Sequence, residues 1–142
     1  MIPFGMEIVT LYNRHETKDE NGRTVAIWYR TVLAGCSWTL KRIRAWDGTA
    51  VILTDEITCR IPEDARYRSP AEWDALVVMT SNFTLAPGDI IVRGSVTDEI
   101  VAAFKASDLI AKYRRAGVMT VNAAQDNFRL GFPIGHYCAK GA

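Results

Sequence analysis

The amino-acid sequence predicts a mainly β protein: a small β-barrel or sandwich with one or two short helices and long loops, in a single domain over residues 1–142. Three observations support this fold class. Segments rich in β-branched and aromatic residues alternate in polarity with a period of two, as half-buried strands do. Turn signals separate these segments at short intervals. The 142 residues, 49% of them hydrophobic, suffice for one core without disulfides or metals.

The first half of the chain contains the clearest strand patterns. Asn21-Gly22 and Asp47-Gly48 predict tight turns, because these residues tolerate a positive φ. Gly35 is expected to break or bulge a strand. Pro62 is expected to end one, because proline has no N–H to donate. The predicted strands cover residues 7–12, 24–33, 36–41, 51–53 and 57–61.

Two segments of the second half predict helices. Ser69-Pro70-Ala71-Glu72 is a capping box with proline at the first helical position, and a single helical turn is expected after it. Residues 107–117 predict a longer helix, with Ser107 as the N-cap and Gly117 at the left-handed C′ position. Further strands are predicted at residues 90–92 and 118–122, followed by a turn at 126–127 and a closing strand through Ile134, His136 and Cys138.

Charge and cysteine content argue against several classes of protein. The formal net charge of +1 favours neither a nucleic-acid footprint nor a membrane surface. Three cysteines without close spacing argue against a disulfide framework and favour a reducing cytoplasm. The first residues lack the pattern of a signal peptide, and no apolar stretch approaches the roughly 20 residues that span a bilayer. We therefore expect synthesis in the cytoplasm and no membrane partner.

The residues that could carry catalysis do not form a recognisable motif. His136 and Cys138 lie on one face of a predicted strand, and with Cys59 or Cys36 they could bind zinc, but no pair has zinc-ligand spacing. The same residues could form a cysteine–histidine nucleophile pair, yet no nucleophile motif surrounds them. Carboxylates that are sequence neighbours point to opposite faces of a strand. We predict that the protein is not an enzyme and has no catalytic residue, no bound metal and no cofactor.

Two loops and two basic runs are the candidate interaction surfaces. Loops as long as residues 13–23 and 64–82 are usually functional or disordered. Apolar residues in the second loop either cover the barrel end or contact a neighbouring subunit. The basic runs at 41–44 and 112–115 either contact phosphates or are a solvated strand end and a helix C-terminus. The residues singled out are Trp73, Leu76, Val77 and Met79 for a subunit interface; His15, Lys18, Asp19, Glu20 and Arg23 for a channel or joining loop; and Lys41, Arg42 and Arg44 for contact with DNA.

A series of short motifs resembles a family of small proteins from the structural modules of siphophage and prophage genomes. Their order and spacing span nearly the whole chain. The stretch at residues 85–94, LAPGDIIVRG, also resembles small β-barrel head-completion proteins. The motifs are TLYNR at 10–14, WYRTVLAGCSW at 28–38, Ile61-Pro62, YRSPAEW at 67–73, FTLAPGDIIVRG at 83–94, residues 121–127, and His136-Tyr137.

This resemblance implies a virion structural protein at the head-tail interface, or neck, made in the host cytoplasm. Such a stopper would form a homo-oligomeric ring, a dodecamer, that joins portal or adaptor proteins to tail terminator or tail tube proteins. The ring would retain packaged DNA and contact it without sequence specificity. The alternatives are a tail terminator or a capsid decoration protein and, in another class, a β-barrel ligand-binding module.

Overall fold

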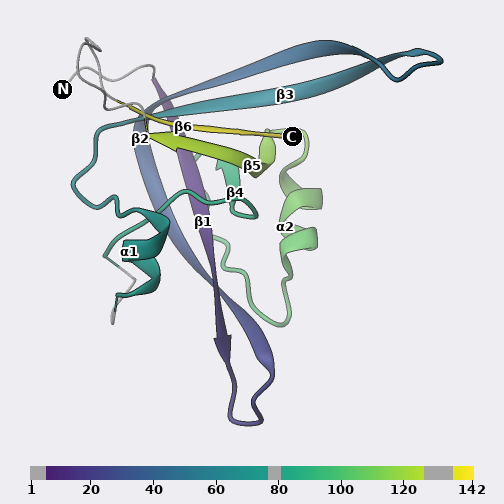
Figure 1. Ribbon diagram of the computed structural model, residues 1–142. Coiled ribbons are helices and arrows are strands. Elements are labelled where there is room, and N and C mark those ends of the chain that lie inside the picture. The colour runs from purple at the N-terminus through teal and green to yellow at the C-terminus, as the bar shows by residue number, and fades with distance from the viewer. Residues whose placement is uncertain (1–5, 77–80, 127–135) are drawn as a thin grey trace.

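Six antiparallel strands close into a barrel in the computed structural model of the chain, which describes residues 6–76, 81–126 and 136–142 (Figure 1). Around the barrel the strands follow the order β1-β2-β3-β6-β5-β4, and β4 pairs with β1 to close it. The mainly β prediction is therefore confirmed, with a barrel as the architecture. The strands are β1 (Glu7–Lys18), β2 (Thr24–Trp46), β3 (Val51–Pro62), β4 (Ile90–Arg93), β5 (Val118–Asp126) and β6 (His136–Gly141).

Alternation along the strands sorts the apolar side chains into two clusters. On β1, Val9 and Leu11 point into the barrel, and Tyr12 points out. The inner cluster takes side chains from every strand and adds Phe83 and Leu85 from the segment before β4. The outer cluster packs Tyr12 and residues of β4 beneath helix α2 (Ala106–Tyr113), through Leu109. The barrel interior is therefore filled by its own side chains.

A side chain accepts a hydrogen bond from the N-cap N–H of each helix. Helix α1 (Pro70–Asp74) has the predicted capping box: Ser69 Oγ accepts from the Glu72 N–H at 3.3 Å, and Glu72 Oε1 accepts from the Ser69 N–H at 3.2 Å. Helix α2 begins before the predicted residue. The N-cap is Lys105, whose N–H donates to Asp108 at 3.0 Å, so the prediction of Ser107 as N-cap is wrong. Gly117 has the predicted positive φ, 121°, but the C-cap of α2 is Arg114, so Gly117 lies beyond the C′ position predicted for it.

Two strands are longer than the sequence pattern predicts. Strand β1 continues to Lys18, so the loop predicted at residues 13–23 is mostly paired strand. Strand β2 is one strand of 23 residues rather than two. Gly35 marks the point where β2 exchanges its partner, because residues up to Cys36 pair with β1 and residues from Ser37 pair with β3. Gly35 has a φ of 72°, so the predicted irregularity is present at this exchange, but the strand does not end there.

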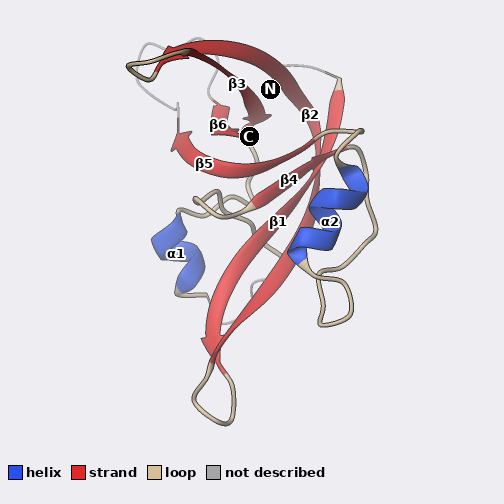
Figure 2. Cartoon of the chain, turned by 90° about the vertical axis from the view of Figure 1, so that its right-hand side faces the viewer, coloured by secondary structure: helices blue, strands red, loops and turns tan. Residues whose placement is uncertain are grey.

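The long strands extend beyond the barrel as two hairpins (Figures 1 and 2). One, the β1–β2 arm, consists of residues 14–28 and turns at residues 19–23. The other, the β2–β3 arm, consists of residues 41–56 and turns at residues 47–50. The two arms leave the barrel in different directions (Figure 1). The barrel and the helices thus form a body from which two ribbons project.

Candidate functional site: the projecting hairpin arms

The β2–β3 arm is a ribbon of two strands with open edges. Its residues pair only with each other, from Lys41 opposite Glu56 to Trp46 opposite Val51. Pairing of β6 with β3 begins at Ile57, at the base of the arm. Within the described ranges, no third strand pairs with either edge of the arm. The backbone N–H and C=O groups along both edges are therefore available to another strand.

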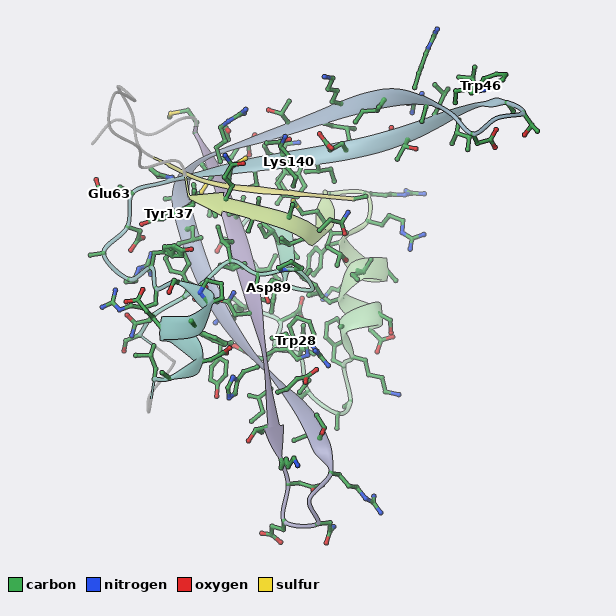
Figure 3. All side chains as sticks on the ribbon, viewed as in Figure 1. Trp28, Trp46, Glu63, Asp89, Tyr137 and Lys140 are labelled. Carbon is green, nitrogen blue, oxygen red and sulfur yellow. The ribbon has the colours of Figure 1, made fainter. Side chains whose placement is uncertain are left out.

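Large apolar side chains are exposed on this arm. Trp46 lies at the far end, remote from the barrel (Figure 3), and is 68% exposed. A ribbon of two strands is marginally stable in water by itself, so exposed apolar groups on it make the arm a candidate contact surface. The others at its base and along it are Leu40 at 61%, Val51 at 59%, Leu53 at 56% and Ile52 at 44%.

The charges on the β2–β3 arm are segregated by strand. Lys41, Arg42 and Arg44 lie on β2, and Asp55 and Glu56 lie on β3. Arg42 Nε and Asp55 Oδ1 are 3.1 Å apart in an exposed ion pair. Because successive residues alternate between faces, Arg42 and Arg44 share one face and Lys41 lies on the other. The three residues predicted to contact DNA are exposed, but they form a basic edge rather than a basic face, and their contact with DNA stays a prediction.

The β1–β2 arm carries the residues predicted for a channel or joining loop. Its turn is organised by Asp19, whose Oδ1 accepts from the N–H groups of Asn21 and Arg23, both at 2.9 Å. Within this turn Gly22 has a positive φ, 76°, and Asn21 does not. Lys18, Asp19, Glu20 and Arg23 are all exposed at this end. Their role in a channel or joint stays a prediction.

His15 lies on the strand rather than in a loop, and it contacts α1. Its ring meets the Trp73 indole edge to face at 5.5 Å, and its Nδ1 lies 3.5 Å from Asp74 Oδ1. Tyr29 packs against the same indole at 5.7 Å. Trp73 is only 1% exposed and packs at the base of the β1–β2 arm, which favours the alternative of a covering role within the chain; its place in a subunit interface stays a prediction. Leu76 is half-buried, and Val77 and Met79 lie outside the described residues.

Comparison with known proteins places the chain in a family without assigning it an activity. Residues 5–142 match a family of unknown function. The chain belongs to that family, DUF6751. No curated protein and no solved structure matches it. The helices in the described part of this DUF6751 chain are too short and too polar to cross a membrane.

Two of the three thiols of the DUF6751 chain, those of Cys36 and Cys59, lie inside the barrel, whereas Cys138 lies on the other face of β6 from the inward-facing Tyr137 and Ala139. Cys36, Cys59 and Cys138 are all free and buried. Contact with the Cys36 thiol, together with burial, raises the pKa of Cys59 well above its ordinary value. A protonated thiol is a poor nucleophile and a poor metal ligand. Among the described residues, no cluster of three or more His, Cys, Asp or Glu could hold a metal ion. The side chain of His136 lies outside that description.

A pocket of about 420 Å³ lies between the base of the β2–β3 arm and the end of α2. Trp38, Leu40 and Ile57 form its apolar wall. Arg114 and Arg115, the second basic run of the sequence, line it together with Asp55. The pocket is therefore amphipathic and continuous with the exposed apolar surface of the arm. It enlarges the area that a partner seated on the arm would cover.

Sequence reasoning missed that residues 51–53 form part of the surface. The run Val51-Ile52-Leu53 was predicted as a strand, and it is one, but its side chains are exposed. A signal was present in the sequence. Val51, Ile52 and Leu53 are consecutive apolar residues, and because successive side chains of a strand point to opposite faces, the hairpin has apolar side chains on both faces. A hairpin packed with one face on a core shows the opposite pattern, apolar on one face and polar on the other.

Proposed function

We propose that this protein is a structural subunit of a tailed-phage virion, a head-closure or stopper component that assembles into a ring at the neck. The observation that carries the assembly role is the β2–β3 arm, whose large apolar side chains are exposed on a ribbon that projects from a filled barrel. Isolated exposed apolar residues are ordinary, but a continuous set on an open-edged ribbon marks a contact surface.

The barrel supplies the rigidity that a ring subunit needs. Its interior cluster spans all six strands, and the segment before β4 is fastened to β1 by hydrogen bonds of Asn13 to Thr84 and Asp89. A rigid body with projecting arms can hold its neighbours at a fixed angle, and a repeated interface then closes a ring. Many modest contacts around the ring add up through avidity.

The neck assignment is supported by the resemblance of the motifs between residues 10 and 137 to siphophage structural-module proteins. In this proposal the subunits form a dodecameric ring between portal or adaptor proteins and the tail terminator or tail tube. The tip residues Lys18 to Arg23 are exposed at the end of the β1–β2 arm, where they can reach a flanking protein or the channel. The alternatives are a tail terminator or a capsid decoration protein.

Quantitative mass spectrometry of gradient-purified particles tests this function. The particles come from a lysate that encodes the chain, and the matched control is a lysate in which its gene carries an early stop codon. We expect the protein in particles at a copy number comparable to that of the portal, and control particles that do not retain DNA. A copy number near that of the major capsid protein would replace the neck role with decoration. Absence from particles would overturn the virion proposal.

A further inference from the structure

The edges of the β2–β3 arm carry opposite charges. The β2 edge bears Lys41, Arg42 and Arg44, and the β3 edge bears Asp55 and Glu56. Neither edge contains a proline, and the register between the two strands of the arm is regular, without a bulge. Proline and bulges are common devices that block strand addition. Both edges can therefore accept a further strand, and each selects for a strand of the opposite charge.

We propose that the occupant of these edges is a second copy of the same chain, with the β2 edge of one arm paired to the β3 edge of the next. When neighbouring arms project in the same direction, β2 of one copy and β3 of the next run antiparallel. They can then continue the same ladder. The result is one sheet that passes from copy to copy. This inference rests on the proposed ring, but it does not depend on the ring being part of a phage.

The register of the arm shows what such pairing places together. Within one copy, Arg42 stands opposite Asp55 and Lys41 opposite Glu56. In a ring without stagger, Arg42 of one copy comes level with Asp55 of the next. Each charge then has an opposite charge on both sides, and signs alternate around the ring. Opposite charges directly across a ladder stabilise the pairing, and like charges destabilise it.

The apolar residues of the arm favour the same arrangement. Trp46 is opposite Val51 within the copy, so the next copy's Val51 lies level with its other side. Side-by-side arms therefore join the exposed residues of each tip, including Ile52 and Leu53, into continuous apolar bands. A core of apolar contacts with charge pairs toward its base is the usual anatomy of a specific interface.

Charge segregation also excludes the symmetric alternatives. Pairing of two β2 edges would place Lys41, Arg42 and Arg44 against like charges, and pairing of two β3 edges would place Asp55 and Glu56 together. Such juxtapositions act against the wrong partner. The remaining contact, β2 against β3, is heterologous, and heterologous contacts produce rings or filaments rather than twofold dimers. The same segregation argues against duplex DNA as occupant, because the acidic strand adjoins the basic one.

A set of charge exchanges in the full-length protein tests this joint. The β2-reversed variant carries Lys41→Glu and Arg42→Glu, and the β3-reversed variant carries Asp55→Lys and Glu56→Lys. The fully exchanged variant carries all four changes, which preserves the opposite charges within each arm. The matched control is Arg14→Glu with Glu16→Arg, which exchanges an exposed ion pair on the β1–β2 arm. Sedimentation velocity and native mass spectrometry measure assembly up to millimolar concentration, and thermal unfolding checks that each variant is folded.

The native protein, the fully exchanged variant and the control are each expected to assemble. Either half-reversed variant is expected to associate about tenfold more weakly, or not at all, because attraction at both charge levels becomes repulsion. The two half-reversed variants are expected to assemble when mixed. Native and fully exchanged protein are expected to form separate assemblies in one tube, because every junction between them opposes like charges. A general effect of net charge would not produce this mutual exclusion.

Two results would overturn the proposal. One is a native protein that stays monomeric at millimolar concentration, including one that binds duplex DNA through Lys41, Arg42 and Arg44 instead. The other is free co-assembly of native and fully exchanged chains. If the arms do not pair but the protein is present in particles, the contact between arms is wrong and the proposed virion role is unaffected. If the arms do pair but the protein is absent from particles, the contact between copies is supported and the proposed phage role is wrong.

Discussion

At the scale of single residues, Asp89 is the group that joins the turn before β4 to strand β1. It is 2% exposed and lies in the interior of the molecule (Figure 3). Its carboxylate accepts from the N–H of Arg14 at 3.0 Å, from the N–H of Ala86 at 2.9 Å and from Asn13 Nδ2 at 2.8 Å. These bonds hold the turn before β4 against β1. Burial outweighs them and raises the pKa of Asp89 to about 6.

This raised pKa predicts that the fold loses stability between pH 4 and pH 6. The unfolded carboxyl ionises near 3.8 and the folded one near 6, so the native state holds more protons in that window. The contribution of Asp89 to the free energy of unfolding is fully present below pH 3.8 and falls by about 3 kcal/mol as the pH rises through 6. The groups with lowered pKa values, including Glu7, Asp64 and Glu72, act in the opposite direction and at lower pH.

Substitution of Asp89 isolates its contribution. Asp89→Asn removes the titration, so the free energy of unfolding of the variant should vary less between pH 4 and pH 6 than that of the native protein. We also expect the variant to be about 1–3 kcal/mol less stable at neutral pH, because an amide N–H replaces an acceptor oxygen beside buried donors. Urea unfolding across this pH range measures both effects, and the exposed turn variant Glu20→Gln is the control. Parallel pH profiles for Asp89→Asn and native protein would contradict the assignment.

At the scale of elements, strands β5 and β6 approach each other closely at Gly141. A Cβ at Gly141 would lie 1.9 Å from the carbonyl oxygen of Thr120 on β5. The register between the strands shifts there, between Val121 and Ala123. Gly141 also pairs with Ile57 on β3. A side chain at this position must therefore move one of two strands.

Gly141→Ala is expected to open this contact between β5 and β6. Overpacking of this kind costs about 1–3 kcal/mol, and here the contact is with backbone, which cannot rotate away. Thermal unfolding measures the loss, and hydrogen exchange of the amides of β5 and β6 locates it. The matched control is Lys140→Ala at the exposed neighbouring position. Equal stability and equal protection of Gly141→Ala and native protein would show that the contact adapts without cost.

Elements determined by local chemistry were predictable, and those determined by distant partners were not. The capping box at Ser69 needs only four residues, and it is present as predicted. The glycine at position 35 was recognised as an irregularity, but local pattern cannot show that β2 leaves β1 for β3 there. The same limit applies to the candidate surfaces. Nothing in the local sequence distinguishes the burial of Trp73 from that of Trp46, yet tertiary packing buries the first and leaves the second exposed.

At the scale of the whole molecule, the barrel and the β2–β3 arm use separate sets of residues. The inner cluster includes Cys36, Cys59 and Ile61, with Trp38 and Ile57 packed against it, and it contains no residue of the arm. The arm adds exposed apolar surface and charge at its edges. Stability within one copy therefore belongs to the barrel. Contact between copies, as proposed above, belongs to the arm.

Removal of the arm should separate these two properties. A variant in which Asn-Gly replaces residues 42–55, between Lys41 and Glu56, keeps a short hairpin with a favoured turn. Its unfolding temperature should stay within about 4 °C of the native value, because the deleted side chains contribute nothing to the inner cluster. The variant should stay monomeric wherever the native protein assembles, as sedimentation velocity would show. A large fall in unfolding temperature would mean that the arm stabilises its own barrel. Unchanged assembly would place the contact between copies elsewhere, with the β1–β2 arm as the next surface to remove.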